Sequence, residues 1–369
     1  MESNDSKTIN ELQADFNKLI SLYFKTPVDV FENILKNSLD KFTQNFSVGK
    51  LDIKQPEEIL IQFYRILRGS SVYEGSPQIV QVNKFNFADF KKNGGEYKTI
   101  NFLAENLEKY PGVIKSSILH GSFATKDFVR DFSDLDVIIV LNDEIFSDSG
   151  ALKRAKEILA RFALLCYKID ILAHHEFMFL TEFDLVNYSS IFVPLEVYDH
   201  SVVLSGQAKL EIFIKETPEI IRQKLNKTLR IFYDSSLAFK KNGFDPFYFK
   251  NALANLMIVP SLVFRVLKRG VYKKDSFSNF KSDFPQISDE ALNFASIERV
   301  KWRQINFLKL MPNYFFKHFP VSIIRLKIKM NRKIVKMLFF FKSKKEIKHF
   351  FTSAEKFSHE VFNTLSNNE

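Results

Sequence analysis

The sequence predicts a mixed α/β core set between two mainly helical regions. Within residues 97–206, runs rich in β-branched residues alternate with amphipathic segments. Before this stretch, in residues 1–96, and after it, in residues 207–369, the pattern is mainly helical. Strands that alternate with helices are typical of an α/β or α+β fold with a mixed sheet. We therefore expect three domains with these boundaries.

The N-terminal region is expected to be helical over much of its length. Apolar residues recur at three- and four-residue steps in residues 8–46, and Pro27 interrupts this pattern and starts a new helix. Residues 56–68 form a further predicted helix. An Asn-Gly-Gly turn signal at residues 93–95 precedes the change to the core pattern.

The core is expected to contain four strands. Helices are predicted at residues 97–110 and 150–166. Strands are predicted at residues 113–120, 134–141 and 167–173 and within 193–204. After residue 207 we expect helices to the end of the chain. Residues 323–330 alternate like a strand, but the wider stretch to Phe341 fits a helix, which its helical neighbours favour.

Composition argues for a folded protein. The 369 residues are 46% hydrophobic and 26% charged, which argues against disorder throughout. One cysteine excludes an intramolecular disulfide and a zinc site made of cysteines alone. The sequence has no uninterrupted apolar run near the roughly 18–20 residues that span a membrane. It also has no signal peptide pattern at its start, so we expect a cytoplasmic protein.

Positive charge is concentrated near the C-terminus. The net charge is +10, and residues 301–348 hold 14 Lys and Arg against one acidic residue, a charge of +13. The rest of the chain, with 39 basic and 42 acidic residues, carries −3. Such a segment attracts the phosphates of nucleic acid or of an anionic membrane surface. A solvated, lysine-rich helix face would have the same composition, so three alternatives stay open.

Residues suited to phosphate and metal chemistry cluster in the core. Gly121 and Ser122 follow the first predicted strand. Asp134 and Asp136 come after eleven intervening residues, at positions i and i+2 of the second strand, where side chains share a face. Asp170 lies between two isoleucines on the third. Such carboxylates repel each other and are costly to bury unless a cation neutralises them, and Mg²⁺ suits them because it binds carboxylates together with substrate phosphates.

This arrangement resembles the DNA polymerase β-like nucleotidyltransferase superfamily. The family pattern is Gly-Ser or Gly-Gly, then Asp-x-Asp or Asp-x-Glu between hydrophobic residues, then a third acid on a later strand. The chain matches it with Gly121-Ser122, Asp134, Asp136 and Asp170. A glycine turn that admits phosphate, placed beside three carboxylates, is typical of metal-dependent nucleotidyl transfer. The resemblance covers roughly residues 97–206, less than a third of the chain.

The resemblance implies a role for each matched residue. Gly121 and Ser122 would hold the β and γ phosphates of a nucleoside triphosphate. Asp134 and Asp136 would hold the nucleotide-bound Mg²⁺, or Mn²⁺ in its place. Asp170 would ligate a second metal and help to deprotonate the acceptor hydroxyl. The implied enzyme is a nucleotidyltransferase that moves a nucleoside monophosphate from ATP or another triphosphate to a hydroxyl, and releases pyrophosphate.

A second resemblance lies in residues 255–277. A helix ending at Gly270 and followed by a Lys-Asp pair resembles the helical domain of aminoglycoside-type nucleotidyltransferases, in which a lysine reaches the triphosphate. The match here is Lys274, with Lys273 as the other candidate. The alternative is an ordinary glycine-terminated helix with basic residues at its negative end. This resemblance favours a small-molecule or sugar-like acceptor.

Two further interpretations remain open. The basic segment would suit a template-independent enzyme that acts on RNA, and a non-catalytic nucleotide-binding scaffold could keep the same fold. His174 and His175 follow Asp170 closely. Adjacent residues at a strand end face opposite sides, so we expect this pair to be a polar strand exit rather than a joint metal site. The sequence identifies neither the nucleotide nor the acceptor.

Overall fold

A computed structural model describes residues 2–35, 55–69, 77–86, 94–189, 193–214, 218–338 and 343–366. Its N-terminal helices are α1 (Glu2–Lys25), a helix over residues 28–35, and α3 (Pro56–Gly69). The break at Pro27 and the helix that begins at Pro56 are confirmed. The part of the predicted first helix beyond residue 35 lies outside the described residues. So do residue 93 of the turn signal and residues 339–342 of the basic segment.

The middle of the chain alternates between strands and helices. Its elements are β1 (Gln78–Gln81), β2 (Asn83–Lys84), α5 (Gly94–Leu107), β3 (Ile114–His120), α6 (Gly121–Ala124), β4 (Asp136–Leu141), η1 (Asp143–Phe146), α7 (Ser149–Ala163), α8 (Leu165–Ile169), β5 (Met178–Leu180), α9 (Glu182–Val186), α10 (Leu195–Tyr198), β6 (Val202–Gly206) and β7 (Lys209–Ile212). Strands β1, β2 and β7 lie outside the range 97–206, so the domain boundaries stay a proposal.

A mixed five-stranded sheet organises this region, as predicted. Its strand order is β2-β6-β3-β4-β5. Strand β3 runs antiparallel to both β6 and β4, whereas β5 runs parallel to β4 and β2 parallel to β6. In the register between β3 and β4, His120 lies opposite Asp136. The turn after β3 and the start of β4 therefore meet at one edge of the sheet.

The predicted strand over residues 167–173 is wrong. This segment contains the end of α8, followed by a turn, and the strand comes later, at β5. The helix ends at Asp170, whose N–H makes the last helical bond, to the Cys166 carbonyl. Its backbone is extended, with φ −135° and ψ 109°, and its side chain accepts from the Leu172 N–H. Such a local side-chain bond competes with a strand ladder. The prediction within 193–204 is half right, since α10 precedes β6 there.

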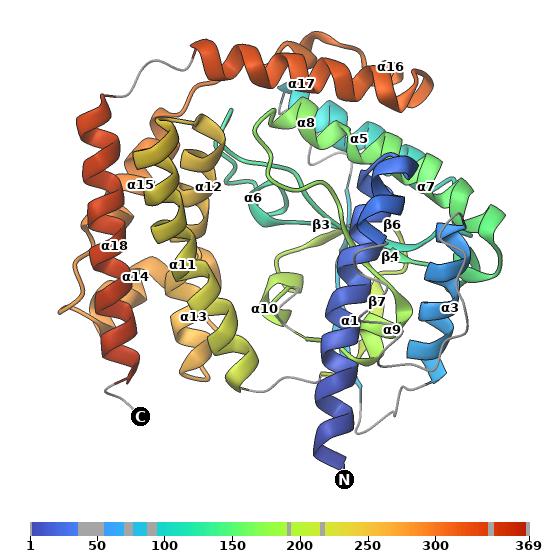
Figure 1. Ribbon diagram of the computed structural model, residues 1–369, viewed down its shortest axis with the longest axis horizontal. Helices are drawn as coiled ribbons and strands as arrows, with labels where there is room; N and C mark the ends of the chain where they lie inside the picture. The colour runs from blue at the N-terminus through green and yellow to red at the C-terminus, as the bar shows by residue number, and fades with distance from the viewer. Residues whose placement is uncertain are drawn as a thin grey trace.

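The prediction of helices after residue 207 is wrong for Lys209–Ile212, which form β7, a strand paired with β1. From α11 onward the described chain is helical apart from η2 and connecting loops, as predicted. It comprises α11 (Pro218–Asn242), α12 (Pro246–Leu256), α13 (Val259–Val266), α14 (Lys273–Asp283), α15 (Glu290–Lys301), η2 (Phe307–Leu310), α16 (Asn313–His318), α17 (Val321–Leu338) and α18 (Lys344–Ser366). Figure 1 shows α11 to α15 and α18 gathered beside the sheet, while α16 and α17 cross the top of the molecule toward α5, α7 and α8. The helix prediction for the alternating stretch is confirmed by α17.

Within the part of the chain that the structure describes, one apolar stretch meets the length and composition of a membrane span. It is Pro246–Val266, the run that contains α12 and α13, and 61% of its most apolar window is buried inside the fold. That burial is typical of a core helix. One apolar core joins the N-terminal helices, one face of the sheet and the C-terminal helices, and a second cluster covers the opposite face of the sheet.

A buried carboxylate attaches the N-terminal helix to the sheet domain. Asp184 of α9 is fully buried. It accepts hydrogen bonds from the Gln13 and Asn17 amides of α1, at 2.7 Å each, and from the backbone and hydroxyl of Thr181, also at 2.7 Å. A buried charge is tolerated when its lone pairs are all used in this way. Asp184 thus holds α1 in place against α9.

We expect Asp184→Ala to lower the free energy of unfolding by about 3 kcal/mol or more, because four buried donors lose their acceptor. Urea unfolding followed by circular dichroism measures this. The matched control is Asp234→Ala, which removes an exposed i,i+4 partner of Arg230 and should cost less than about 0.5 kcal/mol. Equal losses in the two variants would contradict this role of Asp184.

Candidate active site

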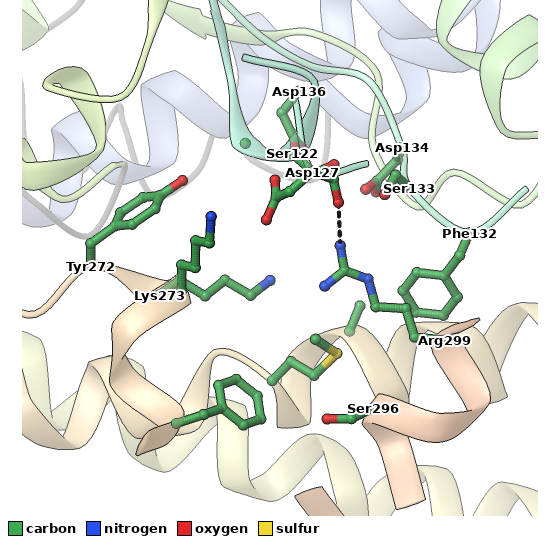
Figure 2. A pocket seen from close by; sticks show the side chains of 15 residues that line it. Ser122, Asp127, Phe132, Ser133, Asp134, Asp136, Tyr272, Lys273, Ser296 and Arg299 are labelled. Atoms are coloured by element: carbon green, nitrogen blue, oxygen red, sulfur yellow. Dashed lines mark hydrogen bonds between the residues drawn. The ribbon is translucent and has the colours of Figure 1, made fainter. Parts of the chain in front are cut away.

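A cavity of about 290 Å³ lies between the sheet edge and the C-terminal helices. It is lined by Gly121, Ser122, Asp127, Phe132, Ser133, Asp134, Asp136, Ala254, Met257, Tyr272, Lys273, Lys274, Phe277, Ser296 and Arg299. Figure 2 shows its two walls, with aspartates on the sheet side and Tyr272, Lys273 and Arg299 on the helical side. Five of the six predicted site residues therefore face one space.

The turn after β3 needs its glycine for two reasons. Gly121 has φ +69°, in the left-handed region that favours glycine. A Cβ at this position would also overlap the Asp136 carboxylate. The chain can therefore bring Ser122 and its backbone beside Asp136 only if this residue is glycine. The Thr125 hydroxyl donates to the Gly121 carbonyl at 3.2 Å and holds the turn.

Asp134 and Asp136 share the cavity, although only Asp136 belongs to β4. About a fifth of each side chain is exposed. Burial would raise the pKa of Asp134, but the hydrogen bond from His174 and the charges of Lys250 and His175 hold it well below the usual range. Burial alone would lower the pKa of His175, but its bond to Asp136 and the charges of both aspartates raise it to about 9. Both aspartates are thus compensated by nearby cations.

The histidines do not face opposite sides, so that expectation is wrong. They lie in a loop between α8 and β5 rather than on a strand. His174 Nδ1 lies 3.3 Å from Asp134 Oδ2, and His175 Nε2 lies 3.6 Å from the same oxygen and 3.0 Å from Asp136 Oδ1. Side chains of adjacent residues alternate in direction along a strand, whereas adjacent residues of a loop can point the same way.

The opposite wall of the cavity is cationic. Lys273 and Lys274 begin α14, and Arg299 comes from α15. Burial lowers the pKa of Lys273, and the nearby Arg299 charge lowers it further. The Arg299 guanidinium donates to the Asp127 carbonyl at 3.5 Å, as drawn in Figure 2. Three cations therefore face the aspartates across a space that could hold a polyphosphate.

Gly270 lies next to the sheet domain rather than at a helix end. Helix α13 ends at Val266, earlier than expected. A Cβ on Gly270 would overlap the Glu196 carboxylate of α10. Gly270 therefore lies at a close approach of this segment to α10, and the two lysines that follow it line the cavity.

Asp170 is separated from the cavity lining by its own partners. The residue is fully buried. One carboxylate oxygen accepts from Gln304 Nε2 at 2.7 Å and the Leu172 N–H at 3.0 Å, and the other forms a buried ion pair with Lys250. Both oxygens are therefore engaged. In this arrangement Asp170 connects the sheet domain to α12 and to the segment before η2.

The donor set fits one divalent cation at the aspartate wall. Asp134 and Asp136 offer carboxylate oxygens to the cavity, as Mg²⁺ or Mn²⁺ requires. Among the residues that the structure describes, one group of three metal-binding side chains, Asp134, His174 and His175, brings its ligand atoms within 4.8 Å of one another. A second cation that uses Asp170 does not fit, because Lys250 already neutralises that carboxylate.

Several residues of the site carried no recognised sequence signal. Arg299 and Gln304 lie in unremarkable stretches, and only the fold brings them to the core. Lys250 did have a signal, because it is the one charged residue in the apolar helix Pro246–Leu256. A buried lysine in such a helix predicts a buried acidic partner.

The comparison with protein families agrees with this geometry. Residues 100–198 match the family model of the nucleotidyltransferase domain, which assigns this segment to the polymerase β-like superfamily. The matched segment contains Gly121, Ser122, Asp134, Asp136 and Asp170, but no residue of the cationic wall. No curated protein and no solved structure matches the chain.

We expect Lys250→Met to lower the free energy of unfolding by about 3–5 kcal/mol, because the Asp170 carboxylate stays buried without its partner. The double variant Asp170→Asn/Lys250→Met should recover much of that loss. Chemical denaturation of the single and double variants measures the coupling between the two residues. A normal stability of Lys250→Met, with metal binding lost in Asp170→Asn, would instead make Asp170 a metal ligand.

Proposed function

We propose that this protein is a metal-dependent nucleotidyltransferase that transfers a nucleoside monophosphate from a nucleoside triphosphate to a hydroxyl group. One observation carries the proposal. Within a single cavity, Gly121-Ser122 and two aspartates of the nucleotidyltransferase domain lie opposite Lys273, Lys274 and Arg299. Carboxylates suit a divalent cation, and the opposite cations suit the phosphates that share it. A magnesium-bound triphosphate has both kinds of partner.

The cavity would promote the reaction by positioning the triphosphate and by stabilising its negative charge. Asp134 and Asp136 would hold the divalent cation, which, when bound, neutralises charge on the triphosphate. Lys273 and Lys274 would contact the β and γ phosphates beside Ser122. The acceptor oxygen forms a bond to the α-phosphorus in line with the bond that breaks, and pyrophosphate leaves with that electron pair. The hydroxyl proton passes to a carboxylate or to water.

A small, polar acceptor is the version of this function that we favour. A second cavity of about 350 Å³ adjoins the first and shares Tyr272 and Lys274 with it. Its other lining residues include Asn83, Asp199 and His200, whose polar groups suit a sugar-like molecule. The resemblance to aminoglycoside-type enzymes points the same way. An RNA acceptor and a non-catalytic scaffold remain the alternatives.

We expect one of ATP, CTP, GTP and UTP, with Mg²⁺ or Mn²⁺, to raise the unfolding midpoint of the full chain. A ligand at a hundredfold excess over its Kd adds about 2.7 kcal/mol of stability. Asp136→Asn should abolish the shift, and Lys273→Met should weaken nucleotide binding by about 10–100-fold, the loss of one charge-assisted contact.

The matched control is Lys281→Met on the same helix as Lys273. This lysine is exposed and pairs with Asp289, so its loss should leave nucleotide binding unchanged. Transfer itself is measured as pyrophosphate release and as label carried from the α-phosphate to candidate acceptors. No response to any nucleotide with either cation would reject the enzyme and favour a scaffold.

For the basic segment 301–348 we propose contact with an anionic membrane. Several of its cations are engaged inside the fold, namely Lys309 with Asp131, Lys317 with Asn106, Arg325 with Glu176, Arg332 with the Ile171 carbonyl, and Lys336 with Asp245. The exposed lysines of α17, Lys327, Lys329 and Lys333, flank a second feature, an exposed apolar stripe.

The stripe consists of Ile323, Leu326, Met330 and Met337, which are 42–60% exposed. Their spacing places them on one side of α17, away from the buried Ile324 and Ile328. Large exposed apolar side chains between lysines are typical of helices that lie in a membrane interface. Nucleic acid would use the lysines but not the stripe, so lipid is the better fit. The protein would then act at the cytoplasmic surface of a membrane.

We expect the full chain to float with vesicles that contain phosphatidylserine or phosphatidylglycerol, and not with phosphatidylcholine alone. Leu326→Asp/Met330→Asp should reduce flotation about tenfold or more, because two buried apolar contacts become charges that anionic lipid repels. Phe362→Asp, at an exposed position of α18, is the control. Flotation that is equal in all variants, together with salt-sensitive RNA binding, would favour nucleic acid.

A further inference from the structure

Because Asp170 is engaged elsewhere, a metal at this site would need ligands other than the expected third acidic residue. Asp170 was expected to complete the ligand set, but Lys250, Gln304 and the Leu172 N–H already use both of its oxygens. A divalent cation at Asp134 and Asp136 must therefore take its remaining ligands from other groups. The nearest metal-binding side chains that the structure describes there are His174 and His175.

We propose that His174 and His175 are metal ligands, and that they form with Asp134 and Asp136 a mixed imidazole and carboxylate centre. The proposal rests on the proposed function only in that both use the same cation position. It assigns that position to a first-row transition metal such as Mn²⁺, Co²⁺ or Zn²⁺, in preference to Mg²⁺.

The spacing of the ligand atoms supports this centre. Metal–ligand bonds of about 2.0–2.2 Å at tetrahedral or octahedral angles place neighbouring ligand atoms about 3.0–3.6 Å apart. The separations here are 3.0 Å from His175 Nε2 to Asp136 Oδ1, 3.3 Å from His174 Nδ1 to Asp134 Oδ2, and 3.6 Å from His175 Nε2 to Asp134 Oδ2. One ligand atom from each of Asp134, His174 and His175 lies within 4.8 Å of the other two, so these three could surround one ion with little movement. Asp136 lies outside that group and would join it by moving with its partner His175.

The orientation of His175 is the one that a metal ligand needs. Its Nδ1 lies 3.1 Å from the Glu176 carbonyl. A carbonyl oxygen can only accept, so Nδ1 carries the proton and donates it to this bond. Nε2, which faces the aspartates, is then the atom that would bind an ion in place of its own proton. Ligating histidines generally donate their other N–H to a carbonyl or carboxylate in this way.

The loop that carries the pair is held from outside. The Arg332 guanidinium of α17 donates to the Ile171 carbonyl at 2.8 Å and the Ala173 carbonyl at 2.7 Å. These bonds fix the backbone immediately before His174. The two rings lie edge to face with centroids 4.3 Å apart, so both can turn toward Asp134. A ligand loop that is already held in this way loses less conformational entropy when an ion binds.

Ligand type decides which ion the centre prefers. Imidazole nitrogen suits Zn²⁺ and other transition metals, whereas Mg²⁺ prefers oxygen ligands and retains water. Two imidazoles in the set would therefore raise affinity for Mn²⁺, Co²⁺ or Zn²⁺ relative to Mg²⁺. The alternative is that the histidines only neutralise the aspartates, in which case they leave as an ion arrives and contribute no selectivity.

The test measures metal binding to the full chain after chelator treatment, without nucleotide. Calorimetric titration with Mn²⁺, Zn²⁺ and Mg²⁺ should give a lower Kd for the first two ions than for Mg²⁺. His174→Ala and His175→Ala should each raise the Kd for Zn²⁺ by about 100-fold. Loss of a residue that only hydrogen-bonds to a metal ligand costs about 10–100-fold in affinity, so loss of a ligand itself should cost at least as much. His349→Ala, an exposed histidine paired with Glu290, should leave it unchanged.

A second measurement needs no variant at the site. With Co²⁺ bound, the wild-type protein should gain the visible absorption of a nitrogen-ligated ion, and its histidine ring protons should shift for two of the seven histidines. An unchanged Kd in the His174→Ala/His175→Ala double variant, or unshifted histidine signals on metal binding, would overturn the proposal. If metal binds as described but no nucleotide is transferred, the centre stands and the proposed function fails.

Discussion

The structure is arranged around the negative charge of Asp134 and Asp136. Two half-buried carboxylates at one sheet edge repel each other, and their burial is costly unless cations lie near. The chain supplies compensating groups from three directions. His174 and His175, from the loop before β5, contact the two carboxylates; the cations are Lys250 from α12, Lys273 from the start of α14 and Arg299 from α15.

This requirement explains why the C-terminal helices belong to the site rather than merely adjoining it. Lys250 enters the sheet domain and pairs with Asp170 there. The segment at Gly270 lies against Glu196 of α10, and Lys273, which follows it, lines the cavity. Arg332 of α17 holds the histidine loop. The nucleotidyltransferase segment alone would present an acidic surface, and the helical region turns that surface into a cavity of two opposed charges.

The core of the site could be predicted because its residues are close in sequence. Gly121 and Ser122 are separated from Asp134 and Asp136 by one loop, and the pairing of β3 with β4 brings them together. Lys274 also lines the cavity, and its predicted contact with the nucleotide stays a prediction. The burial of Asp170 in a turn, away from the cavity lining, could not be predicted. Its position between two isoleucines fits a strand or a buried turn equally well. Its partners Lys250 and Gln304 lie 80 and 134 residues further along the chain.

By itself, the sequence determined the mixed sheet between helical regions, the turn at Gly121-Ser122 and the aspartate pair, since each depends on local spacing and backbone preference. Tertiary structure alone decided which carboxylates remain available. Whether an aspartate binds a metal or a lysine depends on which side chains lie within a few ångströms, and helices distant in sequence supply those neighbours. The same reason applies to His174 and His175, whose shared direction follows from the loop that Arg332 holds.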